Sequence, residues 1–258
     1  METRPEAKNR RSAPKNRPLR VYWAVVLFAI VGTGLRSAGL DPPPGVPEVT
    51  NALLILSGVW ALSHWLLIPP MPWIVAFLLG FAVEWIGLAT GWPFGAYVYT
   101  GAWWPALPGP GGAFPLLLPF AWLLVAGASY ALARNWFSGL AAALVGGLLA
   151  ALFDLALLEP VMVERLGFWR WLQPGPLPGG APWSNFFAWW ATAGLAGYVF
   201  TRWDLAPRRP NATAAGVLAP FALFLLWLLW LGPAGPPSDE SSGQREETQT
   251  WARIASSS

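Results

Sequence analysis

Residues 139–162 read GLAAALVGGLLAALFDLALLEPVM, and this stretch decides the class of the fold. Asp154 and Glu159 are its only charged residues, and it is longer than the roughly 20 residues that an α-helix needs to cross a bilayer. A helix that is apolar on every side is buried either in lipid or in a large core. The stretch therefore predicts a membrane-spanning helix.

The composition of the whole chain is typical of an integral membrane protein. Of its 258 residues, 55% are hydrophobic and only 11% are charged, and the mean hydropathy is +0.45. A soluble domain carries about 25% charged residues, so this chain has too few to cover a water-exposed surface of its size. The 19 tryptophans favour membrane–water interfaces, where the ring is buried and its N–H group meets water.

Six further apolar segments flank residues 139–162, and turns rich in proline and glycine separate them. The sequence thus predicts an all-α, polytopic transmembrane helical bundle of about seven spans. These spans are expected at roughly 21–40, 52–68, 73–89, 114–133, 139–162, 185–203 and 214–232. The transmembrane domain covers 21–232, between a basic tail at 1–20 and an acidic, serine-rich tail at 233–258, both predicted to be disordered.

The distribution of Lys and Arg predicts the orientation, because cytoplasmic segments carry the excess of these residues. With the N-terminus inside, the inner segments hold 11 of them and the outer segments hold 5. We therefore expect a multi-pass protein of the cytoplasmic membrane with its N-terminus inside and its C-terminus outside. The basic residues lie in the N-terminal tail and in short loops, so topology explains them better than a nucleic-acid partner does.

Six polar residues stand in or beside the apolar spans, where a charged side chain costs about 2.5–3.5 kcal/mol on insertion scales. They are Asn51, His64, Glu84, Asp154, Glu159 and Asn185, and the predicted topology places the last four near the outer end of the bundle. Convergence at one depth is typical of a site built between helices. Structural alternatives remain open. The carboxyl groups can simply accept hydrogen bonds from backbone or indole N–H groups, and Glu159, beside Pro160, can face water. For Asn185, capping of a helix is the likelier role.

Residues 84–99 read EWIGLATGWPFGAYVY, in which a carboxylate leads into a Gly/Pro turn and then a tyrosine pair. The glycines permit a tight re-entry, and the aromatic rings suit the wall of an apolar cavity. This block resembles the signature of the membrane-bound carotenoid biosynthesis family that includes acyclic carotenoid 1,2-hydratases. Residues 154–171 (D-x4-EP, then FWRW) and 180–189 (G-x-P-x2-N-x3-W) agree with it, although that family has Asp where this chain has Glu159. The resemblance covers roughly residues 50–205.

The resemblance implies hydration of the terminal C1–C2 double bond on an acyclic end group of a carotenoid of the lycopene, γ-carotene or C50 type. The product is a tertiary alcohol. The implied catalytic residues are Asp154, Glu84 and Glu159. The implied substrate-binding residues are Tyr97, Tyr99, Trp92, Phe94, Asn185, Trp189 and Trp169.

The residues suit this chemistry, since adding water to such an alkene needs a strong acid and passes near a tertiary cation. A carboxyl group in an apolar site tends to keep its proton, and aromatic faces stabilise a cation. We expect Asp154 to donate the proton with Glu84 as its partner, although the reverse assignment is almost as well supported, and Asn185 to position the water. No cofactor is expected, and a chain with one His and no Cys offers no metal site.

Other functions compete with this hypothesis. A proton-coupled transporter of a small apolar or amphipathic solute also uses carboxyl groups in the membrane, but the chain is small and has no evident inverted repeat. A non-catalytic scaffold is a further alternative, whereas a retinal-type photoreceptor is excluded because every Lys lies in the first 15 residues. The expected partners are the carotenoid within the bilayer, membrane lipid and other enzymes of the carotenoid pathway.

Overall fold

The computed structural model describes residues 17–204 and 212–232, and its main elements are seven α-helices. Their bounds are α1 Arg17–Ser37, α2 Val46–Leu66, α3 Pro70–Thr90, α4 Leu118–Ala133, α5 Gly139–Phe153, α6 Trp183–Thr201 and α7 Ala212–Trp230. Each helix coincides with one of the expected apolar segments, which confirms the all-α polytopic bundle. Of the two tails predicted at 1–20 and 233–258, only residues 17–20 are among those described, and they begin α1.

The helices have the lengths and compositions of a multi-pass membrane protein. Helices α1, α2, α3 and the continuous helical segment Gly139–Arg165 are long and apolar enough to cross a bilayer. Helix α4 and the segment Ala214–Trp230 are apolar but shorter. Many large side chains on the outside of the bundle are apolar, as lipid contact requires.

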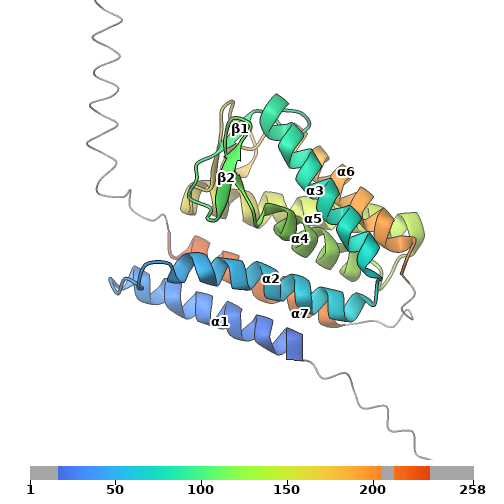
Figure 1. Cartoon of the computed structure of the whole chain (residues 1–258), viewed down its shortest axis with the longest axis horizontal. Helices are drawn as coiled ribbons and strands as arrows, with labels where there is room; N and C mark the ends of the chain where they lie inside the picture. Colours follow the sequence, from blue (N-terminus) through green and yellow to red (C-terminus); the bar gives the residue numbers. More distant parts are fainter. Residues whose placement is uncertain (1–16, 205–211, 233–258) are drawn as a thin grey trace, which may run out of the picture.

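The bundle has two layers (Figure 1). Helices α1, α2 and α7 form one layer, and α3, α4, α5 and α6 form the other. Successive helices reverse direction, so the long connections 91–117 and 166–182 meet at one end of the molecule, on the left in Figure 1. This is the end that the sequence predicts to face outward.

The two long connections are joined by short strands that the sequence did not indicate. Strand β1 (Tyr97–Tyr99) pairs antiparallel with β4 (Trp169–Trp171), and β2 (Ala106–Gly109) pairs with β3 (Gly112–Pro115). Strands of three or four residues are too short to show a period of two, so hydrophobic patterning cannot reveal them. The β1–β4 pair fixes both connections over the end of the bundle.

Helix α5 does not end as an ordinary α-helix, because its last part is π-helical over Asp154–Leu158 and Pro160–Arg165. Within it the Glu159 N–H bonds to the Asp154 carbonyl, five residues back. In a regular α-helix two residues five apart point about 140° away from each other. The wider π turn brings the side chains of Asp154 and Glu159 toward the same side.

Candidate active site

Glu84 lies near the end of α3 with 5% of its surface exposed, and its carboxyl group accepts three hydrogen bonds. Tyr97 and Tyr99 donate their hydroxyls to Oε2, at 2.5 and 3.3 Å, and the Trp122 indole donates to Oε1 at 2.9 Å. Three donors on one carboxyl group restrict its position and orientation. Glu84 is therefore held in place by partners from β1 and α4.

Glycines allow the chain to return onto Glu84. Gly91 ends α3 in the left-handed conformation (φ 76°), and its N–H bonds to the Gly87 carbonyl. Phe94 and Tyr97 then pack back onto Gly87, where a Cβ atom would lie 2.9 Å from both side chains. Only glycine leaves room for this approach, which delivers the Tyr97 hydroxyl to the carboxyl group.

A second cluster joins Asp154, Glu159 and Asn185, which are 1%, 1% and 4% exposed. The Asn185 amide nitrogen donates to Asp154 Oδ2 and to Glu159 Oε1, at 2.9 Å in each case. The Trp171 indole donates to Glu159 Oε2 at 3.1 Å. Asp154 Oδ1 is buried and has no hydrogen-bond partner among the described residues.

This cluster changes two expectations from the sequence. Asn185 is not a helix cap, because α6 begins at Trp183 with Pro182 as its N-cap and without a side-chain cap. Glu159 does not face water, because the segment around Gly179 covers it. A Cβ atom on Gly179 would lie 2.9 Å from the Glu159 carbonyl oxygen.

The two tyrosines remain hydrogen-bond donors over the whole physiological range of pH. Burial first, and the nearby Glu84 carboxyl second, raise the pKa of Tyr97 and Tyr99 above the ordinary value of a phenol. A raised pKa keeps the proton on each hydroxyl as the pH increases. Both phenols are therefore neutral when they contact Glu84.

The two clusters meet in one pocket of about 750 Å³ between the layers of the bundle. Eight of the ten residues selected from the sequence line it. They are Glu84, Phe94, Tyr97, Tyr99, Glu159, Trp169, Asn185 and Trp189. The other two do not: Asp154 is hydrogen-bonded to Asn185, which lines the pocket, and Trp92 is 70% exposed in the turn after α3.

Four further tryptophans, Trp103, Trp104, Trp122 and Trp171, also line the pocket, and none of them is among the ten residues selected from the sequence. Trp122 stacks on Trp189 with 3.8 Å between ring centroids. Tryptophans that anchor a span lie near its ends, whereas Trp122 lies inside an apolar run, and that position was the available signal. Trp171 belongs to the aromatic run of residues 168–171.

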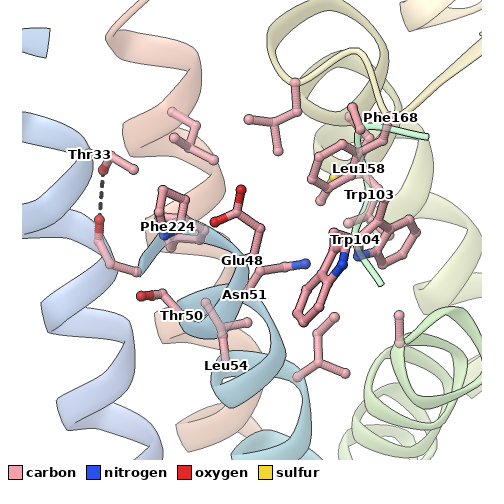
Figure 2. A pocket seen from close by; sticks show the side chains of 18 of the residues that line it. Thr33, Glu48, Thr50, Asn51, Leu54, Trp103, Trp104, Leu158, Phe168 and Phe224 are labelled. Carbon is pink, nitrogen blue, oxygen red and sulfur yellow. Dashed lines mark hydrogen bonds between the residues drawn. The ribbon is translucent and has the colours of Figure 1, made fainter. Parts of the chain in front are cut away.

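The pocket suits proton transfer to an apolar molecule. Its walls are mainly aromatic and aliphatic, and Figure 2 shows Leu54, Leu158, Phe168 and Phe224 among the side chains that surround it. Of the described residues that line it, only Arg36 carries a positive charge. Buried carboxyl groups thus face an apolar space without a cation beside them.

Comparison with known proteins identifies the family of this chain. The profile of the family described as carotenoid biosynthesis protein matches residues 50–233. A bisanhydrobacterioruberin hydratase of Haloarcula japonica is 28% identical over 194 residues, which are 69% of this chain and 64% of the hydratase. The chain thus spans slightly less than two thirds of that relative, and no solved structure matches it. Because the profile covers more than half of its length, the chain belongs to the carotenoid biosynthesis protein family.

Proposed function

We propose that this protein hydrates the terminal C1–C2 double bond of an acyclic carotenoid end group and forms a tertiary alcohol. The observation that carries the proposal is the pair of buried carboxyl clusters on one apolar, aromatic-walled pocket. The name of the Haloarcula japonica relative, a hydratase, supports the same reaction class. We expect the protein to work in the cytoplasmic membrane, where a carotenoid dissolves.

The acid is assigned to the cluster of Asp154, Glu159 and Asn185. One amide nitrogen contacts both carboxyl groups, and two negative charges held that close repel strongly in an apolar region. We assign one proton to this pair. Glu159 lines the pocket and delivers the proton to C2, whereas Asp154 lies behind Asn185 and positions the pair.

The tertiary cation that forms at C1 needs stabilisation, and Glu84 supplies it. Its carboxylate is held by two phenols and an indole, so its charge is fixed at the pocket wall. The stacked rings of Trp122 and Trp189 add their electron-rich faces. Water then bonds to C1 and releases one proton, which balances the proton that Glu159 gave to C2, so the net change is the addition of one water molecule.

The substrate enters end first. A cavity of about 750 Å³ between the helix layers holds an end group and part of the polyene, and the remainder of the chain stays in the lipid. The aromatic walls suit a carotenoid of the lycopene, γ-carotene or C50 type. No polar anchor is needed for the polyene, because burial of its apolar surface provides the binding energy.

Expression in a lycopene-accumulating bacterium tests the proposal. Mass spectrometry of the pigments is expected to show molecules that have gained one water. Glu159→Gln and Glu84→Gln are each expected to lower the product at least about 100-fold, since they remove the proton donor or the charge opposite the cation. Asp154→Asn is expected to lower it less.

Glu164→Gln is the matched control, because Glu164 is an exposed carboxylate in the same helical segment and the amide retains the oxygen that accepts from the Gly179 N–H. It is expected to keep normal conversion. Normal conversion by both Glu159→Gln and Glu84→Gln would contradict the mechanism. Wild-type protein that leaves the pigments unchanged would contradict the hydration of lycopene.

A further inference from the structure

The pocket has a third polar group, which the reaction described above does not use. Glu48 and Asn51 on α2 line it from one side, and Trp103, in the connection between β1 and β2, lines it from the other (Figure 2). Trp103 is 5% exposed. Glu48 and Asn51 are separate from the two carboxyl clusters, since α2 belongs to the opposite layer of the bundle (Figure 1), whereas Trp103 packs against Tyr99.

Two atoms of this group are left without partners by the protein. Among the described residues, neither Glu48 Oε2 nor Trp103 Nε1 has a hydrogen-bond partner, and both atoms are buried. Burying a polar atom without a hydrogen bond is costly, so proteins leave few such atoms. An unpaired acceptor and an unpaired donor on residues that line the same cavity are each a place where a small polar molecule can bind.

Water has the chemistry that fits. A buried water typically makes two to four hydrogen bonds, and here the Glu48 carboxyl accepts, the Trp103 N–H donates, and the Asn51 amide does either. The exposed ion pair between Arg36 and Asp41, at 3.7 Å, lines the same pocket. The polar side chains therefore extend from the surface of the bundle into the cavity.

We propose that Glu48, Asn51 and Trp103 form a water-binding subsite that supplies the water captured by the cation. The proposal rests on the hydration proposed above. Glu159 and Asn185 belong to the α3–α6 layer, and Glu48 and Asn51 belong to α2 in the other layer. An end group between the layers is protonated from one face and receives water from the other.

The fate of the cation reports on this subsite. When water bonds to C1, the product is the alcohol. When no water is in place, the cation loses a proton from C2 or from a methyl group and returns to an alkene. In deuterium oxide the acid adds deuterium to C2. If the cation then loses one of its original hydrogens, the alkene that forms keeps deuterium at C2.

The experiment measures the ratio of deuterated alkene to alcohol, by mass spectrometry, after membranes containing the protein turn over lycopene in deuterium oxide. Trp103→Phe keeps the ring but removes the donor, and Glu48→Leu keeps the bulk but removes the acceptor. Each is expected to raise the ratio about tenfold, the effect of losing one hydrogen bond to the water. The ratio does not depend on how much lycopene each variant turns over.

Trp136→Phe and Glu164→Gln are the matched controls, because Trp136 is 71% exposed and Glu164 is exposed. Both are expected to keep the wild-type ratio. A wild-type ratio in Trp103→Phe and Glu48→Leu would overturn the proposal. So would an equal fall of alcohol and deuterated alkene, which is the signature of a structural role or of binding a hydroxyl group of the substrate.

The failure of the two proposals can be told apart. Wild-type protein that forms neither alcohol nor deuterated alkene would overturn the hydration, and the role of the subsite with it. If the wild-type protein forms alcohol and the variants give the same ratio of deuterated alkene to alcohol, only the water-binding subsite is overturned.

Discussion

Tyr97 and Tyr99 donate to the same oxygen of Glu84, but at different distances, 2.5 and 3.3 Å. The shorter bond carries more of the stabilisation of the carboxylate. We expect Tyr97→Phe to lower hydration about tenfold or more, the effect of losing a hydrogen bond to a charged group, and Tyr99→Phe to lower it less. The measurement is the alcohol formed per amount of protein in isolated membranes.

Equal amounts of each variant in the membrane are the control for folding in this comparison. Tyr97→Phe removes one hydroxyl and leaves the ring, which packs against Phe94. A Tyr97→Phe protein with wild-type activity, or a larger loss in Tyr99→Phe, would show that the Tyr97 hydroxyl does not hold Glu84 for the reaction.

The sequence points to these residues only where placing them in the membrane is costly or where they belong to a motif. A carboxyl group in an apolar span is expensive, so Glu84, Asp154 and Glu159 are conspicuous without a structure. Trp103 and Glu48 are not, because a Trp or Glu near the end of a span is ordinary at an interface. The sequence also does not show which side of a lipid-exposed helix faces the core, because apolar residues cover both sides.

At the scale of the element, the π-helical segment after α5 decides how the acid cluster is assembled. Seven helices follow from the apolar runs, but a backbone bond to the fifth residue back does not follow from hydropathy. The one cue is Pro160, which has no N–H group to donate within the helix. The sequence thus locates Asp154 and Glu159 at one depth, whereas only the structure places both against Asn185.

Helices α5 and α6 pack against each other at glycines, so substitutions there test the packing of the layer formed by α3, α4, α5 and α6. A Cβ atom on Gly147 would lie 2.5 Å from the Trp190 carbonyl oxygen, whereas one on Gly194 would lie 3.7 Å from that of Ala143. We expect Gly147→Ala to destabilise the purified protein by about 1–3 kcal/mol through overpacking. For a chain of this size the loss lowers the Tm by about 2–10 °C.

Gly194→Ala is the control for that measurement, since its new methyl group meets only an ordinary contact distance. Its Tm in detergent is expected to stay near that of the wild type. Equal Tm values for Gly147→Ala and Gly194→Ala would show that α5 and α6 are not packed as closely as the structure has them.

At the scale of the whole molecule, the two-layer bundle explains why the buried carboxyl groups and their partners lie in or beside one pocket. Helices that reverse direction bring the connections 91–117 and 166–182 to one end, and the carboxyl groups, tyrosines and water-binding subsite all lie in that half. The other end carries the short connection between α4 and α5 and the first turn of α1. The orientation of the bundle therefore decides which side of the membrane supplies water to the pocket.

The excess of Lys and Arg predicts that the N-terminus lies inside, with 11 of these residues on the inner segments and 5 on the outer ones. The chain has no Cys, so single cysteines report the orientation directly. Leu107, 54% exposed, lies beside the pocket end, and Trp136, 71% exposed, lies between α4 and α5. We expect a membrane-impermeant thiol reagent to label Leu107→Cys in intact cells, and Trp136→Cys only after permeabilisation. The opposite labelling would place the pocket at the cytoplasmic face, and water would then reach Glu48 from inside the cell.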